Sequence, residues 1–264
     1  MNQNLGRNIY GLAAIALGVI TLFTHQFNVF GVSSQSEILA YIVGAVELIG
    51  GLAIQWQRTE RLGALTLITV YFIFTLFLIP PIIQAPLAYT FWGNFFEEFS
   101  IVLGGVFVFA STIQTTNLQR AEKITRAAYR CFGICVISYA LYQLFYLSYT
   151  AALVPKWFPP GQMFWAVATT IAFALAAIAI ISGRSALLAS RLLVAMFICF
   201  CLLVWLPASL IDPGDLSNWV RNTITLAVAG SIWIISDYLS QLKTSPVKWF
   251  IGQVPIEQRT GSEQ

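Results

Sequence analysis

The chain has 264 residues, of which 58% are hydrophobic and only 9% are charged. Because a soluble globular domain carries about 25% charged residues, this composition excludes an ordinary water-soluble protein. The net charge of +3 is too small to indicate a nucleic-acid-binding protein.

Eight apolar runs follow one another along the chain, and each is roughly long enough to cross a hydrocarbon core about 30 Å thick. Backbone groups in lipid must form hydrogen bonds within their own segment, so each run predicts a helix. The predicted helices cover residues 9–27, 38–55, 62–83, 98–113, 130–153, 163–182, 189–210 and 220–238. The sequence therefore predicts an all-α integral membrane protein with eight transmembrane helices.

Basic residues alternate between the segments that connect these helices. Of the 14 Lys and Arg residues, all but Lys156 and Arg221 fall in one alternate set of segments, which includes both termini. Basic residues favour the cytoplasmic side of a membrane. We therefore expect a bacterial inner-membrane protein whose N- and C-termini are both cytoplasmic.

The second half of the chain repeats features of the first half. A shift of 122 positions aligns Gly11 with Gly133, and a shift of 126 aligns Pro81 with Pro207. Two tandem four-helix bundles related by an axis along the membrane normal would produce this pattern. The predicted organisation is a first transmembrane unit at 1–118, a basic cytoplasmic linker at 119–126, a second unit at 127–245 and a polar cytoplasmic tail at 246–264.

Several short motifs resemble the DoxX-like family of four-helix membrane proteins, which here would be duplicated in tandem. In the second unit the likeness is carried by residues 154–160 (VPKWFPP), 183–184 (GR), 202–207 (LLVWLP) and 212–213 (DP), with Trp219 and Gly230. In the first unit it is carried by residues 44–51 (GAVELIGG) and 61–64 (RLGA). The chain departs from the family at Trp205, where many members have a histidine.

The resemblance implies a role linked to quinones, thiols or oxidative stress. It makes quinone the expected cofactor, and it makes a soluble oxidoreductase or a second copy of the chain the expected partner within the lipid bilayer. The family's helix-two acid matches Glu47, whereas the corresponding stretch of the second unit, residues 169–177, has no acid.

Glu47 lies near the middle of the predicted helix 38–55. An ionisable side chain at this depth costs roughly 2.5–3.5 kcal/mol on insertion scales, and such residues usually have a function. Glu47 is therefore a candidate proton carrier or hydrogen-bond partner of a quinone. The alternative is a structural hydrogen bond to Tyr139, Tyr142 or Gln143 of a neighbouring helix.

Glu97 and Glu98 are neighbouring acids at the predicted outer face of the membrane, and they resemble a pair of catalytic carboxylates. A simpler interpretation is that Asn94 and Glu97 form a variant of the capping box at the start of helix 98–113. Negative charge also suits the positive end of a helix dipole.

Tyr142, Tyr146 and Tyr149 are spaced so that they share one face of the predicted helix 130–153, which also carries Tyr139. This aromatic face predicts either a ring-stacking site for a quinone or packing between helices.

No motif of a known catalytic class is present, and the single histidine and four cysteines have no metal-site spacing. We therefore expect a redox- or quinone-associated or scaffolding membrane subunit without catalytic machinery of its own. The alternative is a small proton-coupled transporter that uses Glu47. A lipid-facing aromatic slot would favour the quinone, and a polar cavity open to one side and lined by Glu47 would favour transport. A tightly packed interior without a cavity would favour scaffolding.

Overall fold

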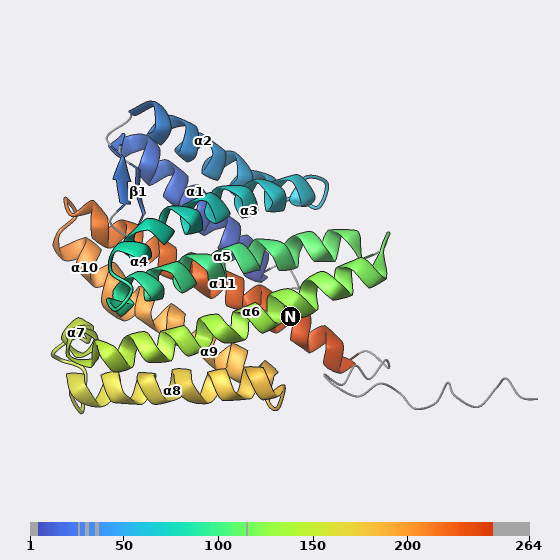
Figure 1. The fold of residues 1–264 in the computed structure, drawn as a ribbon. Coiled ribbons are helices and arrows are strands. Elements are labelled where there is room, and N and C mark those ends of the chain that lie inside the picture. The colour runs from blue at the N-terminus through green and yellow to red at the C-terminus, as the bar shows by residue number, and fades with distance from the viewer. Residues whose placement is uncertain (1–4, 26, 30–31, 35–36, 115, 245–264) are drawn as a thin grey trace, which may run out of the picture.

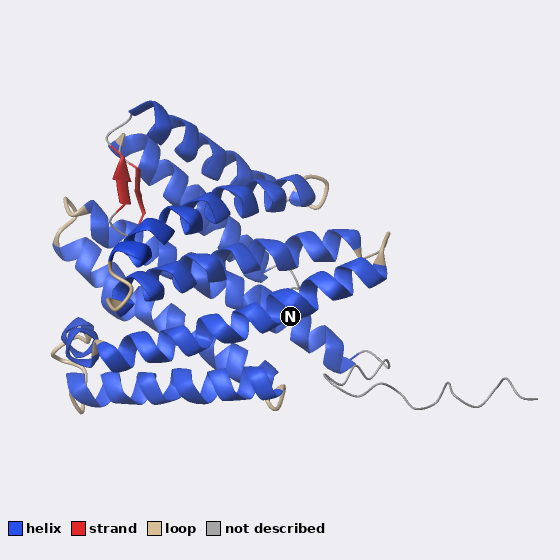
Figure 2. Cartoon of the chain, viewed as in Figure 1, coloured by secondary structure: helices blue, strands red, loops and turns tan. Residues whose placement is uncertain are grey.

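The computed structural model describes residues 5–244, except residues 26, 30–31, 35–36 and 115. Nearly all of this part of the chain is helical (Figures 1 and 2). The predicted tail at 246–264 lies outside the described residues.

The elements follow one another in a simple order. In the first half they are α1 (Leu5–Thr24), a short antiparallel hairpin of β1 (Phe27–Val29) and β2 (Val32–Ser34), α2 (Glu37–Ala53), α3 (Glu60–Phe77), α4 (Ile79–Gln84) and α5 (Tyr89–Ile113). In the second half they are α6 (Leu118–Phe145), α7 (Leu147–Leu153), α8 (Gln162–Ser182), α9 (Ala186–Phe200), the π-helical segment η1 (Cys201–Trp205), α10 (Leu206–Ile211) and α11 (Leu216–Thr244).

Seven helical segments are long and apolar enough to cross a membrane. They are Leu5–Thr24, Glu60–Gln84, Tyr89–Ile113, Leu118–Phe145, Gln162–Ser182, Ala186–Ile211 and Leu216–Leu242. The predicted helix 38–55 forms as α2, which has 17 residues and is not among the seven. Large apolar side chains such as Ile49 and Leu192 are more than half exposed, as expected where helices face lipid. The chain therefore has the architecture of a multi-pass membrane protein.

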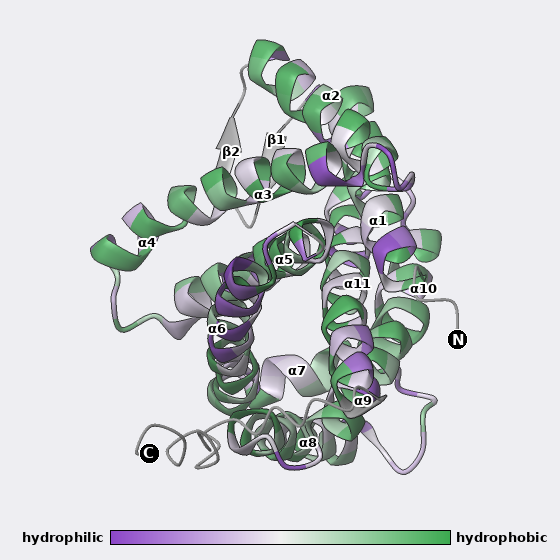
Figure 3. Cartoon of the chain, turned by 90° about the vertical axis from the view of Figure 1, so that its right-hand side faces the viewer, coloured by the Kyte–Doolittle hydropathy of each residue, from purple (hydrophilic) through white to green (hydrophobic). Residues whose placement is uncertain are grey.

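The helices form two groups that meet along α5 and α11. In the first group α1 packs on α2, α2 on α3, and α3 on α5. In the second group α6 packs on α8, α8 on α9, and α9 on α11. The groups join where α5 contacts α6 and α11 and where α11 contacts α1. Seen along the helices, α5 and α11 lie between the two groups (Figure 3).

Small residues allow α5 and α11 to approach their neighbours closely. A Cβ atom on Gly104 of α5 would lie 2.3 Å from the Ser231 hydroxyl of α11, and one on Gly230 of α11 would lie 2.6 Å from the Tyr10 nitrogen of α1. Small residues at helix crossings replace lipid contacts with dense packing, which holds membrane helices together.

The connections fall at two ends of the bundle (Figure 1). We call the end that holds the α2–α3, α5–α6 and α8–α9 turns the basic end, because Arg58, Arg61 and Arg184 lie there. We call the other end, which holds the β1–β2 strands, the hairpin end. The predicted linker 119–126 forms the first turns of α6 at the basic end.

Three predicted helices are interrupted near the hairpin end. The run 62–83 divides into α3 and α4 beside Pro80 and Pro81, and the run 130–153 divides into α6 and α7 at Tyr146. In the run 189–210 the Leu206 N–H bonds to the Cys201 carbonyl, five residues back, and so forms η1 next to Pro207. Proline lacks the N–H that a regular helix needs, which explains the break beside Pro80 and Pro81 and the one beside Pro207. The break at Tyr146 has no proline beside it.

Packing of α1 on α2 provides a test of this fold. A Cβ on Gly51 would lie 2.7 Å from the Gly11 carbonyl oxygen, so Gly51→Ala forces two backbones apart. We expect a loss of about 1–3 kcal/mol, measured as a lower midpoint of thermal unfolding in detergent. Gly214→Ala is the control, since the nearest atom to its Cβ would be 3.6 Å away. Equal unfolding midpoints for the two variants would contradict the close α1–α2 crossing.

Candidate functional site

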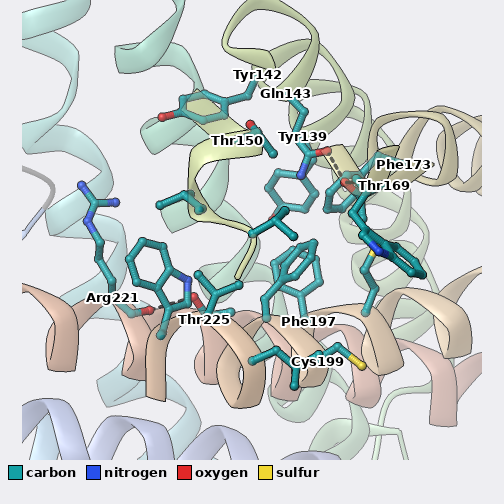
Figure 4. Close-up of a pocket in the computed structure, with 18 of the residues that line it drawn as sticks. Tyr139, Tyr142, Gln143, Thr150, Thr169, Phe173, Phe197, Cys199, Arg221 and Thr225 are labelled. Atoms are coloured by element: carbon teal, nitrogen blue, oxygen red, sulfur yellow. Dashed lines mark hydrogen bonds between the residues drawn. The ribbon is translucent and has the colours of Figure 1, made fainter. Parts of the chain in front are cut away.

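A cavity of about 510 Å³ lies within the second group of helices, with α5 forming one of its walls (Figure 4). Its lining comes from α5, α6, α8, α9, η1 and α11, and α7 with the following loop closes it at the hairpin end. Pockets for small molecules and cofactors typically have volumes of about 300–1,000 Å³. The cavity is therefore large enough for a ligand with an aromatic head.

Aromatic rings dominate one wall of this cavity. Phe173 of α8 lies 5.8 Å from Phe197 of α9, measured between ring centroids, and Phe197 lies 5.8 Å from Phe200. Tyr139 of α6 joins them, with centroids 5.5 Å from Phe173 and 5.6 Å from Phe197. These edge-on and tilted contacts form a stable apolar surface on which a flat ring can pack.

A polar group sits beside this wall. The Gln143 side-chain oxygen accepts hydrogen bonds from the hydroxyls of Thr169 (3.0 Å) and Thr170 (3.1 Å) on α8. The Gln143 side-chain nitrogen donates no hydrogen bond to the described part of the chain. Since Gln143 lines the cavity, this nitrogen is a hydrogen-bond donor for a bound molecule.

The Tyr139 hydroxyl connects α6 to α5. It donates a hydrogen bond of 2.6 Å to the Ser100 hydroxyl, which in turn donates to the Glu97 carbonyl at 2.7 Å. The Tyr139 ring is thereby fixed in the cavity wall.

A charged group lies at the edge of the cavity on α11. The Arg221 guanidinium is 5.7 Å from the centroid of the Trp205 ring, which belongs to η1. The carboxyl of Glu97 on α5 is within electrostatic range of Arg221. The π-helical turn of η1 positions Trp205, and such turns often occur at functional sites. The Arg221 guanidinium therefore offers a second hydrogen-bond donor, whereas the carboxyl of Glu97 offers hydrogen-bond acceptors.

The structure brings together most of the side chains that the sequence singled out on helix 130–153. Tyr139, Tyr142 and Gln143 all line the cavity, and Tyr146 packs against Tyr142 with ring centroids 5.1 Å apart. Gly93 of α5 makes room for Tyr142, because a Cβ there would lie 2.3 Å from the tyrosine ring.

Glu47 lies elsewhere. It is buried on α2, which packs against α1 and α3, and it does not line this cavity. The alternative hydrogen bond from Glu47 to Tyr139, Tyr142 or Gln143 is absent among the described residues. Those three side chains lie on α6, and α5 stands between α6 and the other helices of the first group.

The predicted capping box of Asn94 and Glu97 is wrong. Helix α5 begins at Tyr89, nine residues before the predicted start at 98, so both acids lie inside the helix rather than at its exposed end. Glu97 lines the cavity, whereas Glu98 is 2% exposed and lies on the side of α5 that faces the first group. The two acids are neighbours in sequence but belong to different sites.

Sequence reasoning missed the phenylalanine wall and the role of Arg221. Phe173, Phe197 and Phe200 have the spacing of ordinary core residues, so no local signal distinguishes them. Arg221 carried a signal, since it is one of only two basic residues outside the basic set of segments.

No protein-family model, no curated protein and no solved structure matches this chain in comparisons with known proteins. No group of three or more His, Cys, Asp or Glu side chains suited to a metal ion occurs among residues 5–244 as far as they are described. The cavity residues offer an aromatic surface together with the hydrogen-bond donors of Gln143 and Arg221.

Substitutions at the Tyr139–Ser100 contact test this geometry. Ser100→Ala leaves the buried Tyr139 hydroxyl without its acceptor, which costs about 1–3 kcal/mol. Tyr139→Phe is the matched control, because Ser100 keeps its bond to the Glu97 carbonyl. We expect chemical denaturation in detergent to show a clearly larger loss for Ser100→Ala. A larger loss for Tyr139→Phe would argue against the contact.

Proposed function

We propose that this chain is a DoxX-like membrane protein that binds a quinone-like molecule in the cavity of its second unit and serves a redox system without catalysing a reaction itself. The cavity carries the proposal, since it combines an aromatic wall with few polar groups. A quinone ring would pack on Phe173 and Phe197. Its carbonyl oxygens would accept hydrogen bonds from Gln143 or Arg221, which both present donors there.

Symmetric packing supports the proposed tandem duplication of a four-helix unit. If α1, α2, α3 and α5 correspond to α6, α8, α9 and α11, then each helix contact within one unit has a counterpart within the other. The α5–α11 contact then pairs equivalent helices across the axis.

The same duplication supports α2 as an eighth span. Its counterpart α8 has 21 residues and qualifies as a span, and α2 is continued toward the hairpin end by the β1–β2 strands. If α2 is the eighth span, both termini lie on the same side of the membrane as the basic end. We propose that this side is the cytoplasm of a bacterial inner membrane.

A proton-coupled transporter that uses Glu47 is the second candidate, and it rests on the burial of that acid within a membrane helix. The quinone-binding function is preferred because the cavity is lined by the α6 aromatics and not by Glu47. An oxidoreductase that passes electrons to the quinone, reducing it to the quinol, would dock at the basic end.

Ligand binding can be measured with the purified chain and a decyl-tailed benzoquinone. Because Trp165 and Trp205 line the cavity, bound quinone should quench tryptophan fluorescence in a saturable manner. Ala168 also lines the cavity, so Ala168→Phe should weaken binding at least about tenfold by occupying the space.

The matched control is Ala174→Phe, which adds the same ring to the exposed face of α8 outside the cavity lining. It should bind the quinone like the unaltered chain. Equal weakening by both variants, or quenching that never saturates, would mean that the quinone partitions into the detergent and does not use the cavity.

Topology can be tested with reporter fusions after Arg58, Gln114 and Gly214. The first two residues lie at the basic end and the third at the hairpin end. We expect cytoplasmic signals after Arg58 and Gln114 and an exterior signal after Gly214. Matching signals at all three positions would contradict the proposed orientation. A reporter at the N-terminus that lies on the opposite side of the membrane from Arg58 would show that α2 does not span the membrane.

A further inference from the structure

The first group of helices buries a second set of polar side chains, one from each helix. Tyr10 of α1, Glu47 of α2, Tyr71 of α3 and Glu98 of α5 are each no more than 2% exposed. None of them lines the ligand cavity, so this set consists of different side chains from the proposed quinone site.

Contacts between the helices bring these side chains together. The rings of Tyr10 and Tyr71 lie 6.3 Å apart, and the Tyr10 hydroxyl donates to the Ile101 carbonyl, three residues after Glu98 on α5. Glu47 and Glu98 are within electrostatic range of each other, and both are within range of Tyr71. Both carboxyls are therefore buried, and each is close enough to influence the other electrostatically.

These groups lack the partners that buried polar atoms normally have. One carboxyl oxygen of Glu98 and the Tyr71 hydroxyl have no hydrogen-bond partner among the residues that the structure describes. No ion pair joins Glu47 or Glu98 to a basic side chain in the described part of the chain. Arg7, at the basic end of α1, is bound instead to Glu60 and to the Gln55 carbonyl.

Two ionised carboxylates cannot share such a site at acceptable cost. Each buried charge without a counterion loses its hydration, and two like charges in a medium of low dielectric constant repel each other strongly. A proton on either carboxyl removes one of the two charges and so removes both the repulsion and half of the desolvation cost.

We propose that Glu47 and Glu98 form an intramembrane proton-binding site in the first unit, beside the buried and unpaired hydroxyl of Tyr71. The site accounts for the unpaired atoms and for the absence of a basic partner. It differs from a structural glutamate because the two carboxyls must titrate as a coupled pair.

Other titratable groups face this pair from the neighbouring elements. Glu97 follows on the same helix, Tyr10 approaches from α1, and Tyr139 approaches from α6. Arg221 of α11 acts on Glu97 rather than on the pair. Any measured titration must therefore be assigned to a carboxyl by peptide mapping.

Dicyclohexylcarbodiimide provides the test, because it modifies protonated carboxyls in apolar surroundings. The purified full chain is labelled across a pH series, and the modified residue is located by mass spectrometry. We expect labelling at Glu47 or Glu98 near neutral pH and none at the exposed Glu37. Sodium chloride should not protect the site.

Glu47→Gln is the informative variant, since it keeps the size of the side chain and removes one charge. If the carboxyls are coupled, the loss of Glu98 labelling should move to lower pH by at least about half a unit. Glu60→Gln, which alters an acid already paired with Arg7, should leave the profile unchanged.

Three results would overturn the proposal: no labelling of either carboxyl in folded protein, protection by sodium ions, or a Glu98 profile that is unaffected by Glu47→Gln. Quinone binding is measured separately by fluorescence quenching, so failure of the proton site leaves the ligand cavity untouched and failure of the cavity leaves the proton site untouched.

Discussion

The close approach of α5 and α11 is the contact on which the rest of the structure depends. Gly104 meets Ser231 across this crossing without room for a further methyl group. In lipid there is no hydrophobic drive to bring apolar helices together, so dense packing of small residues must do it. Both helices contact members of both groups, so this crossing joins the two halves. It also determines which face of α5 packs against each half.

The two faces of α5 carry different chemistry as a result. Glu97 turns toward the aromatic cavity of the second group, whereas Glu98, one residue later, is buried toward Glu47 in the first. Successive helical residues point about 100° apart, which is enough to separate two adjacent acids into different environments. The halves thus share their packing scheme but differ in their interiors, one apolar with a ligand-sized space and one holding unpaired carboxyls.

The sequence predicted the helices better than it predicted their ends or partners. Apolar runs located every long helix, because lipid leaves the backbone no alternative to helical hydrogen bonding. They missed the first nine residues of α5, where Asn94 and Glu97 make the segment too polar to read as a span, although both side chains lie in the wall of the cavity. Tyr139 and Gln143 were identified from their helical spacing, but Phe173 and Phe197 were not, because a cavity depends on which helices meet, and hydropathy does not encode that.

An experimental structure in lipid nanodiscs with a decyl-tailed benzoquinone would test the central claim most directly, namely that the second unit holds a quinone-like ring. The account predicts density for a flat ring against Phe173 and Phe197, within hydrogen-bond distance of the Gln143 nitrogen or the Arg221 guanidinium. A cavity filled by protein side chains, or quinone found only on the lipid-facing surface, would contradict it.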